Sequence, residues 1–152
     1  MSIPLLKALT KYYKLVERVA IDPATVVPSE LDFIPGPQDD LESMIWVLTY
    51  AIMLRHQESL GGLQKAQYKQ NVIDRFYGSL SYSGIADMRK VMVFDGVSDE
   101  PEEWIPNPTQ CKWFQSAMML VEGHVRPYSG GSTKAITFDA FDALCDEFIT
   151  DE

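Results

Sequence analysis

Hydrophobic side chains near the N-terminus recur at the spacing of an amphipathic helix. Over residues 3–20 they follow one another at intervals of four and three, so a helix places them on one face. They are Leu5, Leu9, Tyr12, Val16 and Val19, with Leu6 and Tyr13 widening the stripe. A helix of about 18 residues is only marginally stable in water by itself, so this face has to pack against another surface. The expected interaction residues are Leu5, Leu9, Tyr12, Tyr13 and Val16.

Two surfaces are candidates to receive this helix. One is the face of the same chain near Asp40 and Met44. The other is the same helix of a second copy, related by a two-fold axis. The pattern leaves both alternatives open. After the helix, four prolines between residues 21 and 37 predict an extended connection.

The next segment begins with acidic residues and continues almost without polar groups. Asp39 is expected to be the N-cap of a helix over 40–56, with Glu42 three residues later as in a capping box. From residue 44 to residue 54 the only polar groups are two hydroxyls. A helix that is apolar on every side has to be covered on every side, which predicts a central pillar. The residues expected to be almost fully buried are Trp46, Val47, Ile52 and Leu54.

Local signals divide the middle of the chain into further helices. Gly61 and Gly62 are expected to interrupt the chain after the pillar helix, and a mixed helix follows over 63–77. A short helix is expected over 85–94. The residues of the mixed helix expected to face inward are Leu63, Ala66, Val72, Ile73 and Phe76.

The last two helices have clear end signals. Asn107-Pro108 is typical of a helix start and Gly123 of a helix stop. Thr137 is expected to cap the final helix. No segment has the alternating pattern of a convincing strand. The predicted fold class is therefore mainly α, a helical bundle with little or no β structure.

Composition and charge restrict the function classes. The chain has 152 residues and a formal net charge of −9. This negative charge argues against binding to nucleic acid or to an anionic membrane surface. The apolar run over 44–54 is shorter than the roughly 20 residues needed to cross a bilayer. Charges interrupt the N-terminal segment, so it does not read as a signal peptide. We expect a cytoplasmic or nuclear protein with reduced thiols at Cys111 and Cys145.

Candidate chemistry is sparse. The only two histidines, His56 and His124, both suit helix C-terminal positions, and neither has a recognisable nucleophile partner. No Cys and His residues cluster at the spacing of a zinc site. The glycine-rich stretch over 129–134 lacks the spacing of a phosphate-binding loop. We therefore expect no catalytic residue, no cofactor and no metal.

One stretch resembles a known family. Asp39-Asp40-Leu41-Glu42-Ser43, followed by Trp46-Val47-Leu48, resembles the central helix of the protein-kinase C-terminal lobe, as in casein-kinase-type and fungal-type kinases. The resemblance divides the chain into an N-terminal helix and linker over 1–26 and a C-lobe-like domain over 27–152. It implies a salt bridge between Glu30 and Arg126. It also makes Asp40 the counterpart of the aspartate that braces the catalytic-loop backbone in kinases.

The same resemblance argues against catalysis. A kinase needs a glycine-rich loop, a strand lysine, a catalytic loop and a metal-binding aspartate upstream of this helix, and only about 26 residues precede the match here. Asp40 is left with a capping role or with another backbone segment to hold. The resemblance therefore implies a non-catalytic, truncated kinase-like module that binds a protein partner or a second copy of itself. The alternative is a split-kinase fragment that complements a separate N-lobe chain.

Overall fold

The computed structural model describes residues 2–21, 36–79, 81–98, 101–125 and 135–150, and within them the fold is helical without a β-strand. This confirms the mainly α prediction. The longer helices are α1 (Ile3–Ile21), α2 (Pro37–Ser59), α5 (Tyr82–Ser98), α6 (Pro108–Val125) and α7 (Phe138–Thr150). The shorter elements are α3 (Gly62–Tyr68), a π-helical turn (Lys69–Ile73), α4 (Asp74–Tyr77) and a 3-10 turn (Pro101–Glu103).

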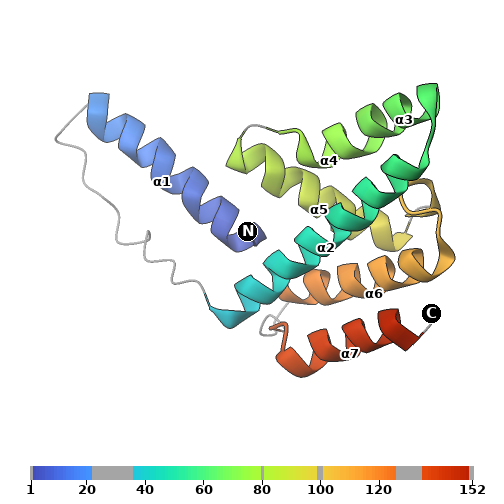
Figure 1. The fold of residues 1–152 in the computed structure, drawn as a ribbon. Coiled ribbons are helices and arrows are strands. Elements are labelled where there is room, and N and C mark those ends of the chain that lie inside the picture. Colours follow the sequence, from blue (N-terminus) through green and yellow to red (C-terminus); the bar gives the residue numbers. More distant parts are fainter. Residues whose placement is uncertain (1, 22–35, 80, 99–100, 126–134, 151–152) are drawn as a thin grey trace.

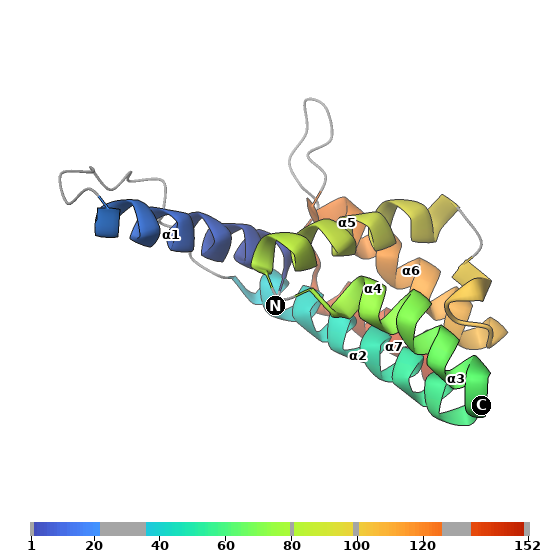
Figure 2. The ribbon, with the colours of Figure 1, turned by 90° about the horizontal axis from the view of Figure 1, so that it is seen from above.

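Helix α5 and helix α6 organise the bundle. Helix α5 packs against α1, α4 and α6, while α6 also contacts α2 and α7. Helix α2 runs across the bundle, and α7 lies along the outer side of α6 (Figure 1). Helix α1 starts beside the beginning of α2 and its far end extends past the other helices (Figure 2). Among the described helices, none lies over one side of α2.

The core lies where α2, α4, α5 and α6 meet. Its largest fully buried side chains include Trp46 from α2, Phe76 from α4 and Phe114 from α6. The Trp104 ring stands edge-on to Phe76, with ring centroids 4.9 Å apart, and closes the core near the 3-10 turn. Burial of Trp46 confirms that the start of α2 is central.

The predicted starts of the last two helices are confirmed, whereas the predicted stop of α6 at Gly123 is wrong by two residues. The Gln110 backbone N–H donates to Asn107 Oδ1 at 3.0 Å, and Pro108 occupies the first helical position, where its missing N–H costs nothing. The Ala140 backbone N–H donates to Thr137 Oγ1 at 3.2 Å. Helix α6 continues two residues past Gly123 and ends at Val125.

The prediction that α2 is covered on every side is wrong. Trp46 and Ile52 are buried, but Val47 is 64% exposed, Met44 is 50% exposed and Leu48 is 38% exposed, while Leu54 is only partly buried. The reason is the packing of α2 against the bundle from one side only. An apolar strip of a central helix thus remains at the surface of this chain.

The inward face of the segment over 63–77 was also predicted incorrectly at its start. Leu63 is 74% exposed and Ala66 is exposed, whereas Val72, Ile73 and Phe76 are buried as expected. Helix α3 is short, and each residue turns an α-helix by about 100°. Leu63 and Ala66 are five and two positions from the buried Tyr68, so they point well away from the side that Tyr68 faces. The π-helical turn that follows shifts the phase again.

The two faces of α2 predict very different effects of truncation. Ile45→Ala should lower the free energy of unfolding by about 2–5 kcal/mol, because Ile45 is fully buried. Leu48→Ala should cost about 1 kcal/mol or less, because Leu48 keeps much of its exposure in the folded chain. Urea denaturation at low protein concentration would measure both. Equal losses would contradict the exposed face of α2.

Candidate functional site

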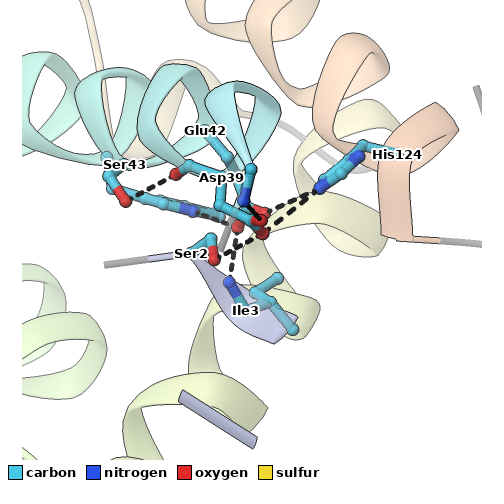
Figure 3. Close-up of polar contacts among 8 residues, drawn as sticks. Ser2, Ile3, Asp39, Glu42, Ser43 and His124 are labelled. Carbon is cyan, nitrogen blue, oxygen red and sulfur yellow. Dashed lines mark hydrogen bonds and ion pairs between the residues drawn. The ribbon is translucent and has the colours of Figure 1, made fainter. Parts of the chain in front are cut away.

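A cluster of polar side chains is buried where α1, α2 and α6 meet (Figure 3). Asp39 and Glu42 come from the first turns of α2, and His124 comes from the last turn of α6. Ser2 and the backbone of Ile3 reach the two carboxylates from the start of α1. Three segments that are far apart in the sequence therefore share one polar cluster.

Asp39 is the third residue of α2 and not its N-cap. Helix α2 begins at Pro37, so Gly36 is the N-cap and the predicted capping box is wrong by three positions. Pro37 favours this earlier start because its fixed φ angle suits the first helical position. Asp39 Oδ2 accepts the Gly36 backbone N–H at 2.9 Å, and the Asp39 N–H donates to the Gly36 carbonyl at 2.9 Å. The remaining oxygen, Asp39 Oδ1, accepts the Ser2 hydroxyl at 2.9 Å.

Glu42 is a fully buried carboxylate whose two oxygens have different surroundings. Its Oε1 accepts the Ile3 backbone N–H at 2.7 Å and the Trp46 indole N–H at 2.8 Å. Burial raises the pKa of Glu42, while these two hydrogen bonds and the nearby His124 and Arg89 act in the opposite direction. Its Oε2 has no hydrogen-bond partner within the described part of the chain. Glu42 thus anchors the start of α1 through one oxygen and leaves the other unused.

His124 faces both carboxylates. Its Nε2 lies 3.8 Å from Asp39 Oδ1 and 3.7 Å from Glu42 Oε2, beyond the length of a hydrogen bond. Only 10% of its side chain is exposed. Neither ring nitrogen has a hydrogen-bond partner among the residues that the structure describes. Among the residues that the structure describes, these three side chains form a group that could hold a metal ion, because one ligand atom from each lies within 4.8 Å of the others.

Asp40 does not share in this cluster. It is exposed on α2, while its neighbours Asp39 and Glu42 accept the backbone N–H groups of Gly36 and Ile3. Of the two roles expected for Asp40, holding a backbone segment falls to Asp39 and Glu42 instead, while Asp40 stays an exposed acid in the first turn of α2. His124 was not expected as a neighbour of these acids, because no spacing pattern links the end of α6 to the start of α2.

Helix α1 packs within the chain. Ile3 and Leu6 are fully buried, and the Tyr13 ring stacks on Tyr82 of α5 with centroids 5.6 Å apart. Tyr12 and Tyr13 remain about half exposed and Leu9 is partly buried. The side chains of Leu5 and Val16 lie outside the described residues.

The surface that receives α1 differs from the predicted one. Its first turn meets Asp39 and Glu42 and the helix packs against α5, while Asp40 and Met44 stay exposed. The predicted pair of Glu30 and Arg126 lies outside the described residues.

An apolar groove lies beside the exposed side of α2. It has a volume of about 310 Å³ and runs between α2, α6 and α7. Its apolar lining comes from Leu48, Ala51, Ile52, Trp113 and Cys145, with Arg55 and Gln110 as the polar members. Burial raises the pKa of the Cys145 thiol, and the nearby Asp142 and Asp146 raise it further, so the reactive thiolate is disfavoured. The groove therefore suits apolar contact better than nucleophilic catalysis.

Two substitutions of Glu42 should separate its hydrogen bonds from its charge. Glu42→Ala leaves the Ile3 N–H and the Trp46 indole N–H buried without an acceptor, at about 1–3 kcal/mol for each donor. Glu42→Gln keeps a carbonyl oxygen for both donors and should cost much less. Urea denaturation in a chelating buffer measures both variants. A loss in Glu42→Gln as large as that in Glu42→Ala would show that the charge, and not the hydrogen bonding, holds the start of α1.

Comparison with known proteins leaves the function to be argued from this chain. No protein-family model matches the sequence, and searches of the curated proteins and of the solved structures gave no significant match. Within the residues that the structure describes, no helix has both the length and the apolar character needed to cross a membrane.

Proposed function

We propose that the chain is a non-catalytic helical module that acts by binding protein, and that its partner on α2 is a second copy of itself. The observation that carries this proposal is the uncovered apolar strip on a central helix. Met44, Val47, Leu48 and Ala51 are all exposed, and we call these four residues the α2 stripe. Their spacing of three, one and three places them on one side of the helix. Large exposed apolar patches mark interaction sites in soluble proteins.

The charged residues that flank the α2 stripe favour a second copy of the chain as the partner on this surface. The α2 stripe has the exposed Asp40 one turn before it and the exposed Arg55 one turn after it. The pattern is symmetric about the midpoint between residues 47 and 48. A second α2 laid antiparallel across that midpoint pairs Asp40 with Arg55 at both ends of the contact. A two-fold interface uses the same patch on both subunits, and this patch is complementary to itself.

Side-chain size supports the same arrangement. The antiparallel pairing puts Val47 against Leu48 at the centre and the long Met44 against the small Ala51 on each side. Ala51 lines the groove between α2, α6 and α7, so Met44 of the second copy can enter the groove there. Methionine adapts well to irregular apolar spaces. The contact extends over about 22 Å of helix at about 1.5 Å per residue, which suits a reversible dimer of modest affinity.

The resemblance to a kinase C-terminal lobe belongs to the same proposal. In a complete kinase, further parts of the protein cover the central helix and its neighbours. In the described part of this chain one side of the central helix is uncovered, and self-association supplies the cover. The alternative of a split-kinase fragment rests on the sequence resemblance alone. This alternative, unlike self-association, requires the chain to bind nucleotide when the separate N-lobe chain is added.

Charge reversal tests the dimer. Asp40→Lys and Arg55→Glu should each raise the dimer dissociation constant by about tenfold, because each variant brings like charges together at both ends of the contact. The double variant restores opposite charges and should recover most of the affinity. Sedimentation equilibrium over a range of concentrations measures all three. Lys65→Glu, an exposed charge reversal on α3, is the control and should leave the dissociation constant unchanged.

Two substitutions at exposed apolar residues, one inside and one outside the contact, test the centre of the proposed dimer. Val47→Asp buries a charge near the two-fold axis in both subunits and should raise the dissociation constant by about 100-fold or more. Leu63→Asp, at a more exposed apolar residue of α3 outside the α2 stripe, should have no effect. A chain that is monomeric at every concentration, or singles that the double variant fails to rescue, would overturn the proposed pairing.

A further inference from the structure

We infer that Asp39, Glu42 and His124 form a zinc-binding site at the junction of α1, α2 and α6. This site lies inside the chain, away from the α2 stripe, and does not depend on the proposed dimer. Its ligand atoms are Asp39 Oδ1, Glu42 Oε2 and His124 Nε2.

The distances suit one shared ion. Zinc binds carboxylate oxygen and imidazole nitrogen at about 2.0–2.2 Å, usually with tetrahedral geometry. Two atoms held in this way are about 3.4 Å apart. His124 Nε2 lies 3.7 Å from Glu42 Oε2 and 3.8 Å from Asp39 Oδ1, a few tenths of an ångström more than this, and the ligand atoms of the three residues all lie within 4.8 Å of one another. A hydrogen bond would need a much larger approach.

An independent observation is the unsatisfied state of His124. Nine-tenths of its side chain is buried, its ring points at the two carboxylates, and neither ring nitrogen has a hydrogen-bond partner in the described part of the chain (Figure 3). Glu42 Oε2 is also buried without a hydrogen-bond partner in the described part of the chain. Buried polar atoms of native proteins are nearly always satisfied by protein, water or an ion. His124 Nε2 and Glu42 Oε2 face one another at 3.7 Å, which places a shared partner between these two atoms.

The surroundings prepare the carboxylates to bind a cation. The Ile3 N–H and the Trp46 indole N–H hold Glu42 Oε1, while the Gly36 N–H holds Asp39 Oδ2. These bonds fix both carboxylates so that Glu42 Oε2 and Asp39 Oδ1, which also accepts the Ser2 hydroxyl, lie toward His124, as outer hydrogen bonds do in metal sites. Two carboxylates are buried together, and a divalent cation compensates their charge.

The Arg89 guanidinium from α5 lies 4.9 Å from the centre of the Trp46 ring, and Arg89 and Lys7 both interact electrostatically with Glu42. The donor set favours zinc over magnesium or calcium, since imidazole nitrogen suits zinc and the harder ions prefer oxygen ligands throughout. Three protein ligands leave a fourth position for solvent.

Zinc at this position would connect the start of α1 to the bundle. Ser2 donates to Asp39 and the Ile3 N–H donates to Glu42, so both of these ligands already hold the beginning of α1. An ion that also binds His124 fixes the same carboxylates to the end of α6. The amide protons of the first turn of α1 should therefore exchange more slowly when zinc is bound.

Calorimetric titration of the chelator-treated full chain with zinc chloride tests the inference. We expect one saturable site per chain, with a dissociation constant in the micromolar range or below, and a rise of several degrees in melting temperature at a hundredfold excess of zinc over that constant. His124→Gln and Glu42→Gln should each weaken binding at least 100-fold. Glu42→Gln keeps its acceptor for Ile3 and Trp46, and circular dichroism checks that it folds.

Matched controls come from the same sequence. His56→Gln changes the other histidine and Glu58→Gln changes an exposed acid of α2, and both should bind zinc like the unchanged chain. The inference is overturned if zinc does not bind, or if His56→Gln weakens binding as much as His124→Gln does. It is also overturned if zinc leaves the melting temperature unchanged while His124→Gln lowers it in chelator. That result would make His124 the cationic partner of the two carboxylates. Should Glu42→Gln fail to fold, His124→Gln still decides, because His124 makes none of the hydrogen bonds that hold α1.

Discussion

The buried carboxylate of Glu42 is the interaction on which the arrangement of the helices depends. One oxygen receives both the Ile3 backbone N–H and the Trp46 indole N–H, so it connects the start of α1 to α2 and orients the largest side chain of the core. A charged group in this position is costly unless its hydrogen bonds are made, and burial accordingly raises its pKa. The chain therefore has little freedom in where α1 begins: the N–H of Ile3 has to meet this oxygen.

Helix α2 combines two requirements that conflict in an isolated domain. Its inner side builds the core through Ile45, Trp46 and Met53, which are almost completely buried. Its outer side carries the α2 stripe, which nothing within the described part of the chain covers. The apolar character of the helix thus has two causes, folding on one side and proposed association on the other. Sequence composition alone does not separate them, because both require the same residue types.

Local signals in the sequence predicted local structure well. Helix ends at Asn107-Pro108 and Thr137 depend on hydrogen bonds within one turn, and both were predicted correctly. The exposed side of α2 was missed because apolarity indicates a covered surface without saying what covers it. The start of the segment over 63–77 was missed because a π-helical turn shifts the phase of the helix in a way that a regular period does not describe. The polar cluster needed the tertiary fold, since His124 reaches Glu42 only through the packing of α6 on α2.

Helix α1 also has a mechanical property that follows from how it is held. Its buried residues, Ile3 and Leu6, lie in its first turns, the Tyr13–Tyr82 contact supports its middle, and its far end extends past the bundle (Figure 2). The 19 residues of the helix span about 28 Å at about 1.5 Å per residue. A rotation of about 10° at the buried end would move the far end by about 5 Å. A rotation at the buried end that is too small to disturb the core therefore moves the far end of the helix by more than the size of an atom.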